Sequence, residues 1–235
     1  MGGQKTQASI IFVQQCSGIQ IIFKEVTIMK ITEKVTMLNG TPFSHVFLVS
    51  TPELVLIDTG MAFQRRNVLR ALKDLGVNFK DIKHIIFTHH DVDHIGSAVQ
   101  LQQLTGAALW ASAEDIPYIT GETPRYGFKK YIGKLQRHKP RGLRAFEGGS
   151  ICGIRVIPTP GHTPGHVCFL YDGVLFAGDL FENKKKGLIP YPAPWNWNDD
   201  MMRDAVKIAA ALDFEWLCPA HGRPVLRADQ AILNG

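Results

Sequence analysis

A single nine-residue segment, Thr88–Gly96, reads Thr-His-His-Asp-Val-Asp-His-Ile-Gly and carries five side chains of the kinds that bind metal ions. Further along the chain, His162 lies in PTPGHTPGH, Asp179 ends LFAGD, and His221 lies in CPAHG. Each follows an apolar, β-rich run, and strand ends that finish in turns present side chains to a shared rim of a sheet. Burying them unpaired at separate core positions would be costly. The pattern therefore predicts a metal centre assembled from distant parts of the chain.

In their order, these four motifs resemble those of the metallo-β-lactamase superfamily, and the likeness extends from Met29 to the C-terminus. That family has Thr-His-x-His-x-Asp-His-x-Gly after a strand, then a Gly-His turn, an Asp that closes a strand, and a His near the end. The resemblance implies an α/β fold, specifically a four-layer αββα sandwich with the site along one edge of its two sheets. It also implies a dinuclear metal-dependent hydrolase.

Carried over position by position, the resemblance implies three ligands for a first ion, three for a second, and one that bridges both. The first set is His89, Asp91 and His162, the second set is Asp93, His94 and His221, and the bridging residue is Asp179. Asp93 is also expected to orient the attacking hydroxide and to carry a proton to the leaving group.

Two further residues, Asp58 and His166, resemble family members that hold the ligands in place by hydrogen bonds. A turn or cap role is the alternative for Asp58, since Thr59-Gly60 follows it, and a packing role is the alternative for His166. Three histidines, His45, His84 and His138, match no motif, and we expect them to be structural or surface residues.

Asp91 stands where most members of the family have a second histidine. A carboxylate makes the first site harder and more negative than an imidazole would, which shifts its preference toward iron or manganese. We expect two divalent ions, with zinc favoured and iron or manganese as alternatives. His90, next to Asp91, is expected to point away from the ions and to be a flanking residue.

The resemblance implies cleavage of an ester, thioester or lactone bond by a hydroxide held between the two ions. Two alternatives stay open. One is a phosphodiesterase or nuclease of the same superfamily, supported by a basic segment over 123–144 with eight Lys and Arg and no acid. The other is a non-hydrolytic di-iron redox protein, because the flavodiiron proteins also have a carboxylate at the position of Asp91.

The basic segment is expected near the pocket mouth, where its charge would attract a small anionic substrate, although most charge runs simply face solvent. Three aromatic residues, Tyr126, Phe128 and Tyr131, interleave with the charges, and Trp195 and Trp197 follow in a second segment that would wall an apolar pocket. Nucleic acid is not expected as a partner, and exposed aromatic residues near the mouth are compatible with a homodimer.

We expect one hydrolase domain over 29–235, since 235 residues with 45% hydrophobic content can bury a sizeable core. Residues 1–28 are interpreted as a non-native N-terminal extension or an extra strand. Their apolar stretches are too short for a membrane span and lack the features of a signal peptide, so neither a membrane nor export is expected. Four cysteines without paired spacing indicate reduced core residues of a cytoplasmic protein. They are Cys16, Cys152, Cys168 and Cys218.

Apolar and β-branched runs predict eight strands. These lie near 45–50, 53–58, 84–88, 107–111, 154–159, 167–171, 174–178 and 216–219. Helical periodicity predicts helices near 63–75, 94–104 and 200–212, the last after the capping sequence Asn198-Asp199-Asp200. Strands and helices interleave, which indicates the α/β class.

Overall fold

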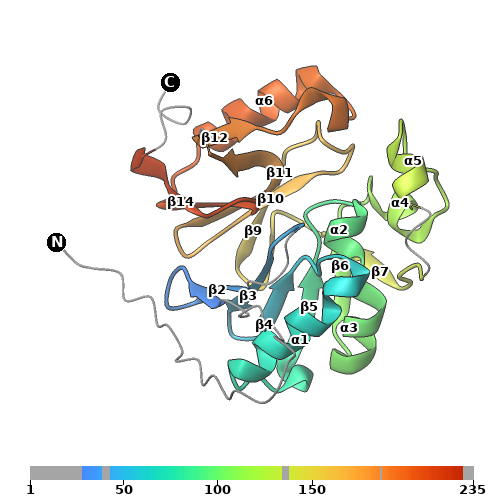
Figure 1. Cartoon of the computed structure of the whole chain (residues 1–235), viewed down its shortest axis with the longest axis vertical. Coiled ribbons are helices and arrows are strands. Elements are labelled where there is room, and N and C mark those ends of the chain that lie inside the picture. Colours follow the sequence, from blue (N-terminus) through green and yellow to red (C-terminus); the bar gives the residue numbers. More distant parts are fainter. Residues whose placement is uncertain (1–27, 39–42, 134–137, 186, 230–235) are drawn as a thin grey trace, which may run out of the picture.

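A computed structural model describes residues 28–38, 43–133, 138–185 and 187–229 of the chain. The interpretation of the first 28 residues, and that of Cys16, falls almost wholly outside these described residues and stays a prediction. Two sheets pack face to face, and helices cover the outer side of each (Figure 1). The predicted four-layer αββα sandwich is therefore confirmed.

The first sheet contains β1 to β7 side by side in sequence order. Their bounds are Ile28–Lys30, Val35–Leu38, Val46–Ser50, Leu54–Ile57, Ile82–Ile86, Ala108–Ala111 and Leu143–Ala145. The pairs from β1 to β4 are antiparallel, whereas β4, β5, β6 and β7 run parallel. Parallel strands end at the same edge of a sheet, so the segments that follow β4, β5 and β6 open onto one rim.

The second sheet has the order β14-β13-β11-β10-β9-β8, with β12 also paired to β11. From β8 to β14 the bounds are Ser150–Ile151, Ile154–Pro158, Val167–Tyr171, Val174–Lys184, Gly187–Pro190, Trp216–His221 and Val225–Leu226. The parallel pairing of β11 with β13 loses its register between Gly178 and Glu182. Irregularities of this kind re-aim side chains beside active sites, and Asp179 lies within this one.

Six α-helices and four short 3-10 helices complete the described fold. Helices α1 to α6 span Arg65–Asp74, Val92–Ile95, Ala98–Thr105, Ile116–Thr120, Lys129–Ile132 and Asp199–Ala210. The 3-10 helices η1, η2, η4 and η5 span Ala62–Gln64, Phe79–Asp81, Ala193–Trp195 and Arg227–Asp229. Within the described ranges, no helix combines the length and apolar character that a membrane span requires.

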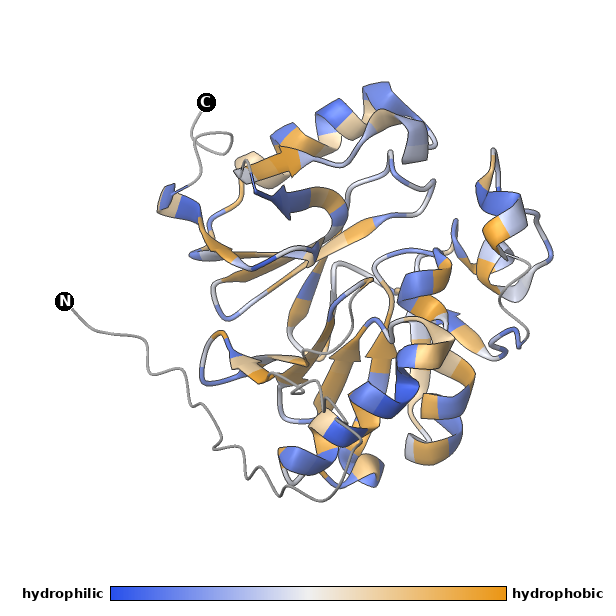
Figure 2. Ribbon diagram, viewed as in Figure 1, coloured by the Kyte–Doolittle hydropathy of each residue, from blue (hydrophilic) through white to orange (hydrophobic). Residues whose placement is uncertain are grey.

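Three apolar clusters hold the layers together. One lies between the first sheet and helices α1 and α3, another between the second sheet and α6, and the third between the sheets. In the third cluster the rings of Phe47 and Phe176 meet edge to face at 5.1 Å between centroids. Figure 2 accordingly shows mostly apolar strands in the interior and helices that are polar on one side.

The sequence-based elements are largely recovered, with two kinds of error. All eight predicted strands exist, but β1, β2, β7, β8, β12 and β14 were not predicted, and β11 runs on to Lys184. The helix predicted over 94–104 is two helices, α2 and α3. The chain breaks there because Ser97 turns to the β4 loop, donating its amide to the Gly60 carbonyl at 3.2 Å and its hydroxyl to the Met61 carbonyl at 2.9 Å.

Candidate metal centre

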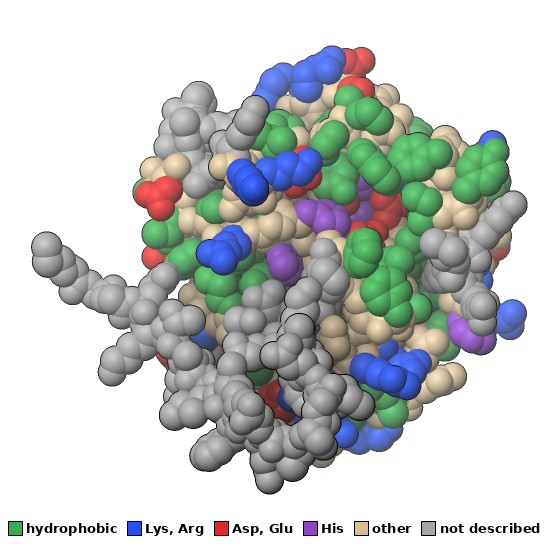
Figure 3. Space-filling view, in the orientation of Figure 1, with side chains coloured by type: hydrophobic (Ala, Val, Ile, Leu, Met, Phe, Trp, Pro, Cys, Tyr) green, Lys and Arg blue, Asp and Glu red, His purple; other side chains and the backbone are tan. Residues whose placement is uncertain are grey.

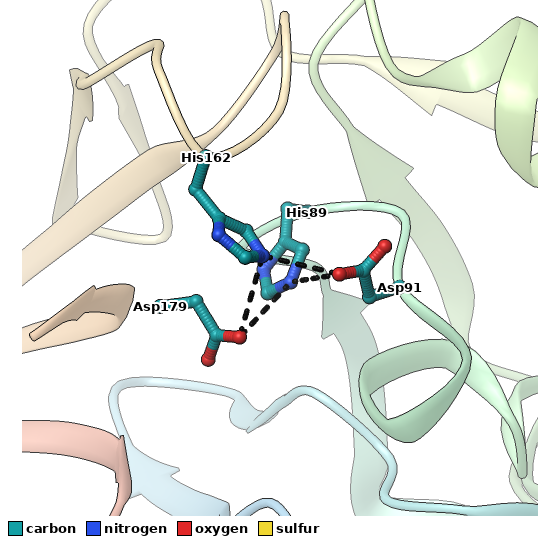
Figure 4. A group of neighbouring side chains, drawn as sticks. All are labelled: His89, Asp91, His162 and Asp179. Carbon is teal, nitrogen blue, oxygen red and sulfur yellow. Dashed lines mark hydrogen bonds and ion pairs between the residues drawn. The ribbon is translucent and has the colours of Figure 1, made fainter. Parts of the chain in front are cut away.

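The first group of metal-capable side chains consists of His89, Asp91, His162 and Asp179, whose ligand atoms all lie within 4.8 Å of one another. Figure 4 shows these four side chains converging from three separate segments of the chain. The Asp91 Oδ2 atom lies 3.6 Å from His89 Nε2 and 3.1 Å from His162 Nε2. The Asp179 Oδ2 atom lies 3.8 Å and 3.4 Å from the same two nitrogens. Two imidazoles and two carboxylates form a donor set that suits a divalent ion.

The second group consists of Asp93, His94 and His221. The other oxygen of Asp179, Oδ1, lies 3.3 Å from His94 Nε2 and 3.2 Å from His221 Nε2. Asp93 Oδ2 lies 3.8 Å and 3.4 Å from those nitrogens. One carboxylate therefore faces both groups, each with a different oxygen.

Several atoms that face the centre of this cluster lack hydrogen-bond partners among the described residues. They are His89 Nε2, His94 Nε2, His221 Nε2 and Asp179 Oδ1, all buried. Buried polar atoms in proteins are nearly always paired, so four orphaned ligand atoms that face one another need an explanation. Divalent cations supply one, and the residues present fit them.

The loop after β5 serves both groups because of its local conformation. Asp91 is the extended N-cap residue of α2, with φ −69° and ψ 151°, and α2 begins directly after it. His89 and Asp91, two apart on the extended stretch, reach the first group. Asp93 and His94 lie in the first turn of α2 and reach the second group.

Asp58 is buried directly behind His94. Its Oδ1 accepts a hydrogen bond from the Thr88 amide at 2.9 Å, and its Oδ2 accepts one from the Thr88 hydroxyl at 2.8 Å. The same Oδ2 lies 2.8 Å from His94 Nδ1. A carboxylate can only accept, so Nδ1 carries a proton and Nε2, which faces the cluster, is the nitrogen that would bind an ion. Burial alone would lower the pKa of His94, but Asp58 and Asp179 outweigh it and raise that pKa well above its ordinary value.

His166 is a neutral ring that contacts the backbone of Asp179. Burial, followed by the neighbouring His162, lowers the pKa of His166 to about 3. Its Nε2 accepts a hydrogen bond from the Asp179 amide at 3.2 Å, and its Nδ1 lies 2.9 Å from the Thr159 hydroxyl. Gly178 makes this approach feasible: its φ is +49°, and a Cβ there would lie 2.7 Å from His166 Nε2.

The charges in the cluster shift the pKa values of its carboxylates in different directions. Burial alone would raise the pKa of Asp179, but His221 and His94 hold it well below its ordinary value. The pKa of Asp91 is also held well below, because the Lys129 ammonium and His162 outweigh its burial. The pKa of Asp93 is raised, chiefly by burial. Asp91 and Asp179 are therefore ionised, as ligands must be.

Asn196 holds the His162 ring and was not singled out in the sequence. Its Oδ1 lies 3.1 Å from His162 Nδ1, while its Nδ2 donates to Asp199 Oδ1 at 2.9 Å and to the Tyr191 carbonyl at 3.3 Å. The two donations fix which end of the amide faces the ring. His162 therefore donates from Nδ1 and keeps its Nε2 lone pair for the cluster. No signal beyond its place between two tryptophans marked this asparagine.

Asp115, also missed, joins the two ligand-bearing loops. Its Oδ2 accepts hydrogen bonds from the His90 amide at 2.9 Å and the Thr163 hydroxyl at 2.8 Å. Its Oδ1 accepts one from the Gly165 amide at 2.8 Å and lies 3.1 Å from His90 Nδ1. The His90 ring stacks on Tyr118 with 4.6 Å between centroids, and its Nε2 lies 3.7 Å from Asp91 Oδ1. His90 is a buried partner of this network and belongs to neither ligand group. The position of Asp115 shortly after β6 was the signal available.

Replacing Asp115 by asparagine is expected to lower the free energy of unfolding by about 2 kcal/mol, because hydrogen bonds to a buried charge are lost and an amide N–H faces donors. Urea unfolding followed by circular dichroism would measure this change. The matched control is Glu114→Gln, since Glu114 is the exposed neighbour in sequence. Equal stability of the two variants would contradict a structural role for Asp115.

The first described part of the basic segment, 123–133, is tied to the ligand loops. The Arg125 Nη2 donates to the His90 carbonyl at 2.6 Å, and the Tyr126 hydroxyl donates to the His162 carbonyl at 2.6 Å. Phe128 meets Trp195 edge to face with 4.4 Å between centroids. Arg125 and Lys129 are buried, so the alternative that this charge run simply faces solvent is wrong for these two residues.

A third group of metal-capable side chains, Glu53, His84 and Cys152, lies apart from the cluster. His84 Nδ1 accepts a hydrogen bond from the Trp110 indole at 3.0 Å, so the proton is on Nε2, which lies 2.8 Å from Glu53 Oε2. A protonated Nε2 has no lone pair for an ion, and His84 is structural as expected.

The cysteines differ in burial. Cys152 is partly exposed, so it is not the core residue expected. Cys168 and Cys218 are buried as expected, and all three are free thiols.

The other two unassigned histidines are also placed. His45 Nε2 lies 2.7 Å from the Gly222 carbonyl, and the His138 side chain is exposed. Trp195 borders the cavity beside the metal groups, as the sequence analysis expected, whereas Trp197 does not line it. Its backbone amide instead donates to the His162 carbonyl at 3.1 Å.

Comparisons with known proteins agree with this geometry. A family model described as the metallo-beta-lactamase superfamily matches residues 40–221. The uncharacterized protein YobT of Bacillus subtilis (strain 168) is 32% identical over 232 residues, which cover 87% of this chain and 97% of YobT. Hydroxyacylglutathione hydrolase GloC of Haemophilus influenzae is 27% identical over 58% of this chain and 65% of its own.

Among solved structures, the fold is similar to that of MEM-A1, a subclass B3 metallo-beta-lactamase isolated from a soil metagenome library. The TM-score is 0.65 with 22% identity, over 83% of this chain and 79% of MEM-A1. At this identity the likeness concerns the fold alone. Probable metallo-hydrolase YybB of Bacillus subtilis (strain 168) is 25% identical over 80% of this chain and 84% of its own. The family match over residues 40–221 and these relatives show that the chain belongs to the metallo-β-lactamase superfamily and is a metal-dependent hydrolase.

Proposed function

We propose that this protein hydrolyses a small ester, thioester or lactone that carries an anionic group. The observation that carries the proposal is the shared carboxylate: Asp179 presents Oδ2 to the first ligand group and Oδ1 to the second. Two adjacent cation positions suit the attack of water on a carbonyl group. Two ligand sets that share Asp179 would hold the two ions. They are His89, Asp91 and His162 for the first ion, and Asp93, His94 and His221 for the second.

When bound, the ions would supply an activated water and would polarise the carbonyl oxygen that it attacks. The other tasks belong to the protein. Asp93 borders the cavity beside the cluster, so it is placed to accept the proton of the attacking water and to deliver it to the leaving oxygen or sulfur. Asp58, Asn196 and His166 fix the rings and the backbone behind the ligands, which keeps the reacting geometry rigid.

The cavity beside the cluster supports a small substrate with mixed character. Its lining residues are Asp91, Val92, Asp93, Arg125, Lys129, Ile132 and Trp195. Ile132 and Trp195 offer apolar contact for an acyl or alkyl portion. With ions bound by the carboxylates of Asp91 and Asp93, the remaining cations Arg125 and Lys129 would favour an anionic portion. The name of the relative GloC denotes hydrolysis of a glutathione thioester, an anionic compound of this class.

The distribution of charge favours a small molecule over nucleic acid. Figure 3 shows the Lys and Arg side chains of this face in separate groups, with histidine and acidic side chains near the centre. A nucleic-acid backbone is bound by a continuous row of cations, each contacting a phosphate. The net charge of +5 is also modest.

A substrate screen tests the proposal directly. The panel contains p-nitrophenyl esters, thioesters, lactones, a β-lactam and bis-p-nitrophenyl phosphate, each acyl substrate with a carboxylated and a neutral form. We expect turnover of an acyl substrate, with about tenfold higher kcat/KM for the carboxylated form because one ion pair in a confined site contributes roughly 1.4 kcal/mol. Added salt should reduce that preference. Fastest turnover of the phosphodiester, or purification with two iron ions and no acyl hydrolysis, would overturn it.

A further inference from the structure

Lys129 places a cation inside the first ligand group. Its ammonium nitrogen lies 2.6 Å from Asp91 Oδ2 and 3.0 Å from His162 Nε2, and the residue is only 4% exposed. It is the first residue of the short helix α5, which belongs to the basic segment that covers the site. A lysine with so little solvent contact needs partners that replace water. Here its partners are two of the residues assigned to the first ion.

The hydrogen-bond directions show that this lysine uses the electron pairs that an ion would use. Asn196 takes the proton of His162 Nδ1, so the Nε2 atom facing Lys129 is an acceptor. The Asp91 carboxylate is likewise an acceptor. A metal ion coordinated by the same nitrogen and oxygen would displace the ammonium, since one lone pair cannot serve both and the two cations repel each other.

The second ligand group is different. Among the described residues, the ion pairs of Asp93 are with His94 and His221 only, and those histidines pair otherwise with Asp58 and Asp179. A metal ion entering there meets orphaned nitrogens at His94 and His221 and displaces no ammonium. The two positions therefore differ in what must be removed before an ion can bind.

We propose that Lys129 is a built-in competitor for the first metal position, so that the two positions fill with unequal affinity. The second position binds its ion first and tightly, and the first position fills only when the ion displaces the ammonium. Displacement releases the ammonium toward the adjoining cavity, which Lys129 also lines. This inference rests on the metal centre proposed above.

Metal content after equilibrium dialysis with Zn²⁺ tests the inference, measured by plasma mass spectrometry on the full-length protein. We expect the wild type to keep about one tightly held ion per chain and Lys129→Met to keep two, with the first position at least tenfold tighter than in the wild type. Lys129→Arg, which retains the charge, should behave like the wild type. Lys130→Met is the matched control, because Lys130 is the exposed neighbour, and it should leave the ion count unchanged.

A second measurement guards against a folding defect in the Met variant. Zinc that binds only the native state raises the melting temperature. The rise caused by Zn²⁺ should be larger in Lys129→Met than in the wild type, whatever the stability of the two zinc-free proteins. Two equally tight ions in the wild type, or no gain in Lys129→Met, would overturn the inference. His221→Ala tests the proposed metal centre separately from the role of Lys129. If this variant retains the tight ion, the proposed metal centre itself is wrong.

Discussion

Replacing Asp179 by alanine is expected to reduce kcat/KM for an acyl substrate by about a thousandfold or more. Among the described residues, Asp179 is the one side chain that faces both ligand groups, and each of its oxygens lies within 3.4 Å of a histidine nitrogen in its group. Its loss removes a donor from both ions and leaves the remaining histidines without their central negative charge. Paired ions contribute several kcal/mol of transition-state stabilisation, and about 4 kcal/mol corresponds to a thousandfold.

Metal content should be measured on the same variant. We expect Asp179→Ala to retain less than one Zn²⁺ per chain after dialysis, whereas the fold, monitored by circular dichroism, persists. Asp213→Asn is a suitable control, because Asp213 is exposed and belongs to neither ligand group. Wild-type activity in Asp179→Ala would contradict the shared-carboxylate site, and lost activity with full metal content would assign Asp179 to another task.

The ligand residues could be predicted from sequence because each lies close to a strand end or, for Asp179, at a break in strand register. His89 follows β5, Asp179 lies in the irregular part of β11, and His221 ends β13. Strands of a sandwich converge at its rim, so a ligand-type residue at such an end can be placed without knowing the loops. The other ligands, Asp91, Asp93 and His94, could be predicted because they lie within a few residues of His89 in one motif.

What sequence reasoning missed depends on segments whose paths are set by long-range contacts. Asn196 reaches His162 across a turn and a long intervening stretch, and Lys129 reaches Asp91 from a four-residue helix. Neither helix α5 nor η4 has enough residues to show a periodicity. A run of lysines in a loop usually faces solvent, so composition alone gave no sign that one of them is buried in the site.

The missed strands have a related cause. Strands β8, β12 and β14 are two to four residues long and lie at or near the margins of their sheet. Such short segments form because an existing strand offers unpaired backbone groups, not because of their own sequence. The site does not depend on them, since its ligands come from the segments after β5 and β9 and from β11 and β13.

Replacing Asp58 by asparagine is expected to lower the metal affinity of the second position, or the activity, by about tenfold to a hundredfold. This range is typical of residues that orient metal-bound histidines. Asp58 lies 2.8 Å from His94 Nδ1 and holds Thr88 through two hydrogen bonds. An amide nitrogen at the position of Oδ2 cannot accept the His94 proton, so the ring is free to adopt the other tautomer and to turn its lone pair away from the ion.

Asparagine is the informative substitution at this position because of the backbone. Asp58 has a φ of +60°, in the left-handed region that asparagine tolerates and alanine does not, so Asp58→Ala would add backbone strain of about 1 kcal/mol. We expect Asp58→Asn to show a lower Zn²⁺ affinity at the tight position, with Asp81→Asn, an exposed aspartate, as the control. A purely structural role predicts instead a lower melting temperature with unchanged Zn²⁺ affinity. Asp58 touches the second group directly through His94, and it reaches His89 of the first group only through the Thr88 hydroxyl, which lies 3.1 Å from His89 Nδ1. Its loss should therefore weaken the second position more than the first, and Lys129→Met should still tighten the first position in the Asp58→Asn background.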